Sequence, residues 1–180
     1  HRTPFSLVYV DAGSPSHVSK VLQQIVDKHG SGFTLLRVPY FVTQHEAKNL
    51  ALSYVRTRYA VFIDNDVMVP DGWLEKLLKC CKDTDAWAVL PLYLEGGWDE
   101  SRNRPDKNVT TVHMAGGHCY SELDEDANRT VFRQKHWFLD TPAAPSLLAT
   151  MTRKKSELLE YHAMLVDLSK MRPNIGSFDE

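Results

Sequence analysis

The chain has 180 residues, 43% of them hydrophobic, so it can bury a sizeable core, and its length favours one domain. Its 21 Lys and Arg and 23 Asp and Glu give a formal net charge of −2 at pH 7. With no basic run longer than residues 153–155, this balance excludes the electropositive surface of a nucleic-acid-binding protein. No apolar stretch approaches the ~20 residues of a transmembrane helix, and we expect a cytoplasmic protein.

The cysteines and the two ends of the chain add two expectations. Cys80, Cys81 and Cys119 have neither the number nor the spacing of a disulfide framework or a zinc site, so buried thiols are expected. The chain begins at His1 rather than at a methionine and stops just after a turn-like segment. We therefore expect a piece excised from a longer protein.

The first half of the chain alternates short apolar runs with amphipathic stretches. This alternation is typical of βαβ units that feed an open, mostly parallel, Rossmann-like α/β sheet. Helical spacing of apolar residues and the position of Pro70 mark the helices. In chain order we predict a strand at 5–10, a helix at 17–28, a strand at 33–38, a helix at 46–56 and a strand at 59–63. A helix opened by Pro70 and a strand at 87–94 follow.

The second half has a different pattern. A polar loop is predicted at 95–107, followed by strands at 109–115, 130–139 and 160–168, with an acidic stretch at 122–126. These strands are expected to be antiparallel additions to the parallel sheet. We expect a single domain over 1–180 with halves at 1–94 and 95–180.

Carboxylates follow two of the predicted strands. Asp11 and the segment Asp64-Asn65-Asp66 stand at carboxyl ends of strands, where an open parallel sheet binds its ligands. Paired carboxylates can hold Mg²⁺ or Mn²⁺ together with the oxygens of a diphosphate, and such an ion would neutralise charge on a leaving diphosphate. A polar turn, in which Asp64 caps loop amides and Asp66 is solvated, is the alternative.

Several motifs occur in the order in which they are found in family 2 glycosyltransferases, which the sequence resembles along its whole length. That family has the glycosyltransferase A fold, and the resemblance implies this fold, truncated at both ends. The motifs are Val10-Asp11-Ala12-Gly13-Ser14, Ala47-Lys48-Asn49-Leu50-Ala51, Phe62-Ile63-Asp64-Asn65-Asp66, Pro70-Asp71-Gly72-Trp73-Leu74, His162-Ala163-Met164-Leu165-Val166 and Ile175-Gly176-Ser177-Phe178-Asp179-Glu180.

The resemblance implies a role for each matching residue. Asp11 would contact the base of the donor, Asp66 would ligate the metal, and Asp64 would face the donor ribose or sugar and contribute to the metal site. Lys48 and Asn49 would line the donor pocket; a solvated helix face with a capping asparagine is the other interpretation. Ala12 stands where the family usually has asparagine or aspartate, which leaves base recognition open. The resemblance also implies that residues 1–94 form a nucleotide-binding half and residues 95–180 an acceptor-side half.

The resemblance also implies what these residues do not supply. The family's first strand and helix, which complete the nucleotide pocket, would precede His1. The general base would lie beyond Glu180, because it must come within hydrogen-bond reach of the acceptor hydroxyl and follows the closing aspartate-glutamate turn in the family.

Two histidines on predicted strands, His113 and His162, could ligate a metal or touch an acceptor, although hydrogen-bonded core histidines are the more frequent case. The loop at 95–107, with Trp98, could cover an acceptor or be a linker.

The function expected is transfer of a sugar, with inversion, from a nucleotide-diphosphate donor to a hydroxyl of a glycan, lipid or protein. A divalent metal, Mn²⁺ or Mg²⁺, is the expected cofactor. A nucleotidyltransferase that makes sugar nucleotides is an alternative, although no Gly-rich phosphate loop is present near the start. A non-catalytic nucleotide-binding or interaction domain is another.

Overall fold

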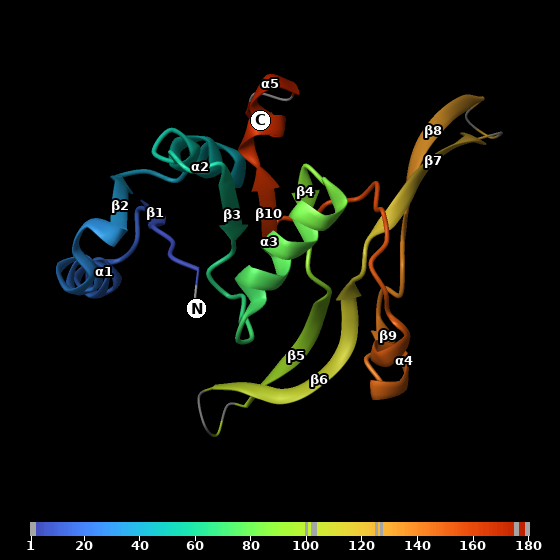
Figure 1. Ribbon diagram of the computed structural model, residues 1–180, viewed down its shortest axis with the longest axis horizontal. Coiled ribbons are helices and arrows are strands. Elements are labelled where there is room, and N and C mark those ends of the chain that lie inside the picture. The colour runs from blue at the N-terminus through green and yellow to red at the C-terminus, as the bar shows by residue number, and fades with distance from the viewer. Residues whose placement is uncertain are drawn as a thin grey trace. The chain divides into compact units, whose positions relative to one another are not determined.

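The structure is a computed structural model, and it describes residues 3–99, 101, 104–124, 126, 128–174 and 177–178 (Figure 1). The chain divides into two compact units. The first combines His1–Val89 with Leu165–Glu180, and the second is the continuous stretch Leu90–Met164. The first unit is thus built from two pieces of chain, with the second unit inserted between them.

The first unit contains most of the helices. Strands β1 and β2 form a parallel pair in register from Leu7↔Phe33 to Ala12↔Val38. A second sheet has the order β3-β10-β4, with β10 antiparallel to β4 (Figure 1). The elements of the first unit are β1 (Leu7–Ala12), α1 (Ser16–His29), the short 3₁₀ helix η1 (Gly30–Gly32), β2 (Phe33–Val38), α2 (Gln44–Leu52), β3 (Tyr59–Ile63), α3 (Trp73–Thr84), β4 (Ala88–Val89), the larger part of β10 (Ala163–Asp167) and α5 (Leu168–Asn174).

The second unit is mainly antiparallel. Strands β5 and β6 form a long curved hairpin, β9 pairs with β6, and β7 pairs with β8 in a second hairpin (Figure 1). Its elements are β5 (Tyr93–Asp99), β6 (Arg104–Met114), β7 (Gly117–Asp124), β8 (Arg129–His136), β9 (Thr141–Pro142) and α4 (Pro145–Thr150).

The central strand β10 holds the first unit together. All five of its residues are buried, and it lies between β3 and β4. Leu165 belongs to a buried cluster with Leu74, Leu77 and Cys81 of α3 and Val89 of β4. A strand buried on both faces is apolar at successive positions, which explains the continuous run Ala163-Met164-Leu165-Val166.

Local sequence signals explain where helix α1 ends and where helix α2 begins. Helix α1 ends at His29 and is followed by Gly30, whose positive φ of 58° is readily adopted by glycine. Helix α2 begins with a capping box, in which the Thr43 side chain accepts from the Glu46 backbone N–H and the Glu46 carboxylate accepts from that of Thr43. This cap places the start of α2 two residues before the predicted start at Glu46.

Most predicted elements are confirmed, and two of them residue for residue. The strands at 33–38 and 59–63 have the predicted bounds. The strand predicted at 87–94 is divided into β4 and β5 instead, and Pro91 lies in the interruption. Proline has no backbone N–H to give to a neighbouring strand, so it interrupts pairing.

The polar loop predicted at 95–107 is wrong, because most of this segment is paired β-structure. Glu95 pairs with Thr111 and Gly96 with Val109, in a β5–β6 ladder with several bulges. The two backbones satisfy each other's hydrogen bonds, so the strands do not need an apolar sequence to form. The loop with Trp98 was expected either to cover an acceptor or to be a linker, but the Trp98 side chain lies outside the described part of the structure.

The expectation of a mostly parallel Rossmann-like sheet is likewise not confirmed. The α/β composition agrees with the prediction and is consistent with a glycosyltransferase A domain, but the structure has several small sheets. Among the described residues β1 and β2 are parallel, whereas the pairs β10–β4, β5–β6, β6–β9 and β7–β8 are antiparallel. Strand β10 comes at the end of the long insertion that separates it from β4 in the sequence, and it runs antiparallel to β4. Because no short crossover helix forces it to be parallel, the alternation of elements could not predict its direction.

Asp167, at the end of β10, is the centre of a buried polar cluster. The residue is 1% exposed, and Oδ2 accepts from Nη2 of Arg58 at 2.8 Å. Oδ1 accepts from the Ser169 hydroxyl at 2.6 Å and from the Ser169 backbone N–H at 3.1 Å. The Arg58 hydrogen bond, followed by those from Ser169, lowers the pKa of Asp167 to about 2 against the effect of burial. This cluster ties β10 and α5 to the segment before β3.

Replacing Asp167 with asparagine is expected to reduce the free energy of unfolding at pH 7 by about 2 kcal/mol. Losing an exposed ion pair costs about 1 kcal/mol, and breaking a buried pair costs about 3–5 kcal/mol. An intermediate loss is expected here because the Arg58 side chain is 57% exposed. Since the folded pKa of about 2 is below the ordinary 3.8, the contribution is complete above pH 5 and disappears as the pH falls towards 2. Urea unfolding at pH 7 and pH 3 measures both effects.

The matched control is Asp83→Asn. Asp83 forms an exposed i,i+4 pair with Lys79, and its loss is expected to change stability by less than about 0.5 kcal/mol. Equal losses in the two variants at pH 7 would contradict the structural role of Asp167.

Among helices in the described ranges, none combines the length and apolar character needed to span a bilayer.

Candidate functional site

Asp11, the next-to-last residue of β1, organises the turn that follows it. Its carboxylate is 4% exposed; Oδ1 accepts from the Ser14 backbone N–H at 3.0 Å and Oδ2 from the Ser19 hydroxyl at 3.3 Å. Hydrogen bonds from Ser14, its side chain first and then its backbone, hold the pKa of Asp11 below its ordinary value although burial acts to raise it. Gly13, with φ 75°, allows the chain to turn back so that these bonds form.

Arg37 is a further partner of Asp11. Its Nε lies 3.8 Å from Oδ2 of Asp11, and its side chain is 46% exposed. The Arg37 guanidinium also donates to the carbonyl oxygen of Ser19 at 3.0 Å. The Asp11 carboxylate is therefore ionised and held by its own turn, by α1 and by β2, so its visible role is to shape the loop at the end of β1.

Lys48 and Asn49 are neighbours on α2 with different surroundings. The Lys48 ammonium donates to Oε1 of Gln44 at 3.2 Å. Burial lowers the pKa of Lys48, and the negative charge of Asp64 acts in the opposite direction. The structure therefore brings these two predicted site residues, from α2 and from the end of β3, within electrostatic range of each other.

The Asn49 amide binds the segment near the end of the chain. Its Nδ2 donates to the carbonyl oxygen of Phe178 at 2.8 Å, and its Oδ1 accepts from the Phe178 backbone N–H at 2.9 Å. The Phe178 ring packs edge-on against Phe62 of β3, with centroids 5.0 Å apart. Of the closing motif predicted at 175–180, residues 177 and 178 belong to the described structure, and Phe178 packs beside the predicted donor residues.

Asp64 follows β3 directly, and Asn65 and Asp66 form a turn. The turn is closed by the Val67 backbone N–H, which donates to the Asp64 carbonyl oxygen at 3.4 Å. Asp64 is half-buried, whereas Asn65 and Asp66 are exposed. Mg²⁺ and Mn²⁺ are commonly held by one or two carboxylates, with water and phosphate oxygens in the remaining positions. An exposed and a half-buried carboxylate one residue apart fit such an ion.

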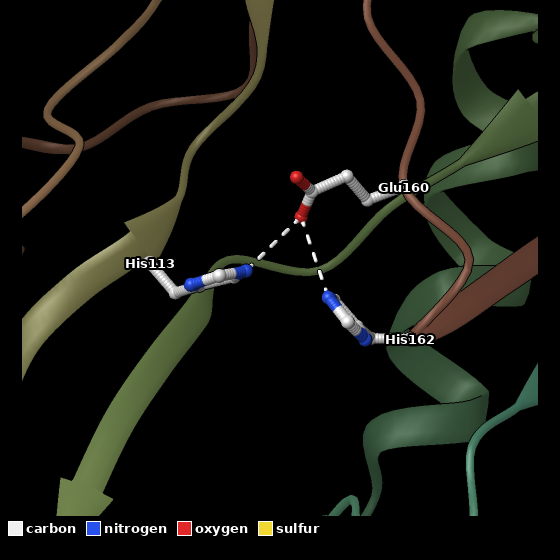
Figure 2. Close-up of side chains that lie close together, drawn as sticks. All are labelled: His113, Glu160 and His162. Atoms are coloured by element: carbon white, nitrogen blue, oxygen red, sulfur yellow. Dashed lines mark ion pairs between the residues drawn. The ribbon is translucent and has the colours of Figure 1, made fainter.

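A second group of side chains lies in the second unit, on β6 and the segment before β10. The Glu160 carboxylate lies between the imidazoles of His113 and His162, as Figure 2 shows. Oε2 of Glu160 is 3.5 Å from Nε2 of His113 and 3.7 Å from Nε2 of His162. The centroids of the two imidazole rings are 5.2 Å apart, and the ring planes are inclined at 64°. Both histidine side chains are partly exposed, 34% for His113 and 42% for His162.

Sequence analysis identified the two histidines of this group but missed Glu160. Glu160 stands two residues before His162, and this spacing of two possible metal ligands was the available signal. It was missed because residues 160–168 were interpreted as a strand. Residues 160–162 in fact precede β10, which begins at Ala163.

The sequence of the chain matches the family model described as Glycosyl transferase family 2 over residues 1–155. The chain belongs to glycosyl transferase family 2. This confirms the family inferred from the ordered motifs. No curated protein gives a match.

The span matched to glycosyl transferase family 2 includes Asp11, Lys48, Asn49, Asp64 and Asp66. It also includes His113 but ends before Glu160 and His162. The family assignment therefore bears on the donor-side residues, whereas the histidine and glutamate group of the second unit has to be interpreted from its own geometry.

Proposed function

We propose that this family 2 glycosyltransferase moves a sugar, with inversion, from a nucleotide-diphosphate donor to a hydroxyl of a glycan, lipid or protein acceptor. Family membership supports sugar transfer in general. The observation that carries the finer proposal is the pair Asp64 and Asp66 directly after β3, with the Asp64 carboxylate within electrostatic range of Lys48.

Each donor-side residue has a distinct part in the proposed site. Asp66, the more exposed carboxylate, is the main ligand for Mn²⁺ or Mg²⁺, and Asp64 holds either the same ion or the donor ribose. When bound, the ion supplies Lewis-acid stabilisation of the leaving diphosphate. Lys48 adds a second positive charge near the diphosphate oxygens.

Asn49 and Asp11 act mainly through the backbone. Asn49 holds the Phe178 segment against α2, and so fixes the helix that carries Lys48. Asp11 fixes the loop after β1, which is the proposed location of the nucleotide base. Substituting either residue is expected to weaken donor binding through loss of this order, even if no direct contact is removed.

A panel of nucleotide sugars tests the proposal. The chain is incubated with UDP- and GDP-linked sugars and Mn²⁺ or Mg²⁺, and the release of nucleoside diphosphate is measured with and without glycan acceptors. Metal-dependent release of UDP or GDP is expected. Formation of pyrophosphate from a sugar phosphate and UTP or GTP would identify a nucleotidyltransferase instead. Nucleotide binding with neither reaction would contradict catalysis by this chain.

A further inference from the structure

We propose that His113, Glu160 and His162 form a Zn²⁺ site, separate in its residues from the Asp64 and Asp66 pair of the proposed donor site. One ligand comes from β6 and two from the segment that leads into β10 (Figure 2). The donor atoms of all three lie within 4.8 Å of one another. The inference goes beyond the proposed sugar transfer and does not depend on it.

The distances suit a tetrahedral ion. Bonds of about 2.0–2.1 Å from Zn²⁺ to imidazole nitrogen and carboxylate oxygen place two ligand atoms about 3.3 Å apart in a tetrahedron. The Glu160 Oε2 to Nε2 distances are 3.5 Å for His113 and 3.7 Å for His162. The donor atoms of all three residues lie within 4.8 Å of one another, and side-chain rotation can bring them to the tetrahedral separation.

Glu160 supplies the second observation. Its Oε2 is shielded from solvent, and among the described residues no donor forms a hydrogen bond with it. A buried carboxylate oxygen without a hydrogen bond is unfavourable, because the charge loses its hydration without gaining a partner. The two imidazole nitrogens lie 3.5 Å and 3.7 Å from it, which is beyond good hydrogen-bond distance. A cation bound by all three atoms would satisfy the oxygen.

A carboxylate on the far side of His113 orients that ring. Oε1 of Glu95, in β5, lies 3.6 Å from Nδ1 of His113. Metal-bound histidines usually present their second ring N–H to a carboxylate or carbonyl, which leaves the other nitrogen directed at the metal. Glu95 therefore favours the tautomer in which Nε2 of His113 has its lone pair facing Glu160.

Tyr93 holds the two ligands before β10 in place. Its hydroxyl accepts from the Ala163 backbone N–H at 3.0 Å and donates to the Glu160 carbonyl oxygen at 3.3 Å. The His162 ring packs edge-on against the Tyr93 ring at 5.4 Å. Tyr93 is 8% exposed, so the segment from 160 to 163 is fixed to β5 before any ion binds.

The ligand set selects the kind of metal. Two imidazoles and one carboxylate suit Zn²⁺, whereas Mg²⁺ and Mn²⁺ prefer oxygen ligands. Three protein ligands also leave the fourth tetrahedral position for water or an oxygen of another molecule, as in zinc sites that take part in reactions. The proposed site is therefore an open one.

The test measures Zn²⁺ affinity of the metal-free 180-residue protein by competition with a chromophoric chelator. Replacement by Co²⁺ adds an absorption spectrum that reports tetrahedral coordination. One Zn²⁺ per chain is expected, with the affinity lowered more than about 100-fold by His113→Ala, His162→Ala or Glu160→Gln, because even outer-shell changes cost about 10–100-fold. Glu95→Gln should lower the affinity by about tenfold.

Two controls make the result specific. His29→Ala removes an exposed histidine of α1, and Asp66→Ala removes the proposed donor-site ligand; neither is expected to change Zn²⁺ affinity. Glu160→Gln keeps the size of the side chain, and its urea unfolding midpoint shows whether a loss of binding is merely a loss of folding. Equal affinity in the His113, Glu160 and His162 variants and in the parent protein, or loss of binding in Asp66→Ala, would overturn the proposal.

Discussion

Replacing Asp66 with alanine is expected to weaken the binding of UDP or GDP in the presence of Mn²⁺ by about 100-fold or more. Asp66 is the exposed carboxylate of the turn after β3 and the main proposed metal ligand. Metal ions contribute several kcal/mol to the stabilisation of phosphoryl charge, and each 1.36 kcal/mol is about a factor of ten. Calorimetry of the nucleotide with and without Mn²⁺ measures the effect.

The neighbouring Asp71→Ala variant is the control for this experiment. Asp71 is an exposed aspartate of the same connection between β3 and α3, and the proposed site gives it no role. Its removal changes the charge of the loop by the same amount as removal of Asp66. If both variants bind as tightly as the parent, or lose the same affinity, Asp66 is not a specific metal ligand.

The Gly117→Ala variant is expected to lose about 3 kcal/mol of stability. A Cβ atom at this position would lie 2.4 Å from Cδ1 of Leu158 and 2.5 Å from the Lys135 carbonyl oxygen. The Leu158 side chain could rotate, but the carbonyl belongs to β8, which pairs with β7 at this point. Overpacking of this kind costs about 1–3 kcal/mol, and a fixed backbone neighbour places it at the upper limit.

Urea unfolding followed by circular dichroism measures this loss, with Gly32→Ala as the control. Gly32 has no neighbouring atom within 4 Å of an added Cβ and no positive φ, so its variant should unfold within about 0.5 kcal/mol of the parent. Equal stability of the two variants would show that β7 and the segment at 158 separate more readily than their packing indicates.

The Gly117 variant should also affect the proposed zinc site. The Ser156 hydroxyl accepts from the Gly117 backbone N–H at 2.9 Å, and the Glu157 backbone N–H donates to the Gly117 carbonyl oxygen at 3.0 Å. These bonds hold the segment that continues to Glu160. Displacing it would move one of the three proposed ligands, so Zn²⁺ affinity is expected to fall together with stability.

How far the sequence predicts this fold depends on the range of the interactions involved. The strands at 33–38 and 59–63 and the helix around 17–28 follow from periodicity within the segment, and the structure confirms them. The β5–β6 hairpin does not, because Glu95 becomes part of a strand through pairing with Thr111, a residue distant in sequence. Polar composition near Glu95 suggested a loop and was misleading.

The same distinction applies to the candidate sites. Asp64 and Asp66 are adjacent in the sequence, so their motif could be recognised and the family it suggested is confirmed. The roles of Asp11, Lys48, Asn49, Asp64 and Asp66 in binding donor and metal stay predictions. His113 and Glu160 meet only because β6 and the segment before β10 are brought together by folding, so a carboxylate between two histidines could not be read from spacing.

The interleaved chain path of the two units has a consequence for biosynthesis. Residues Leu90–Met164 are continuous, whereas Leu165–Asp167, which complete the strand β10 between β3 and β4, are translated after them. Domains commonly fold in the order in which they leave the ribosome. Here the earlier-made unit must wait for its central strand, so the antiparallel unit can fold first while the edges of β3 and β4 are still exposed to aggregation or to chaperones.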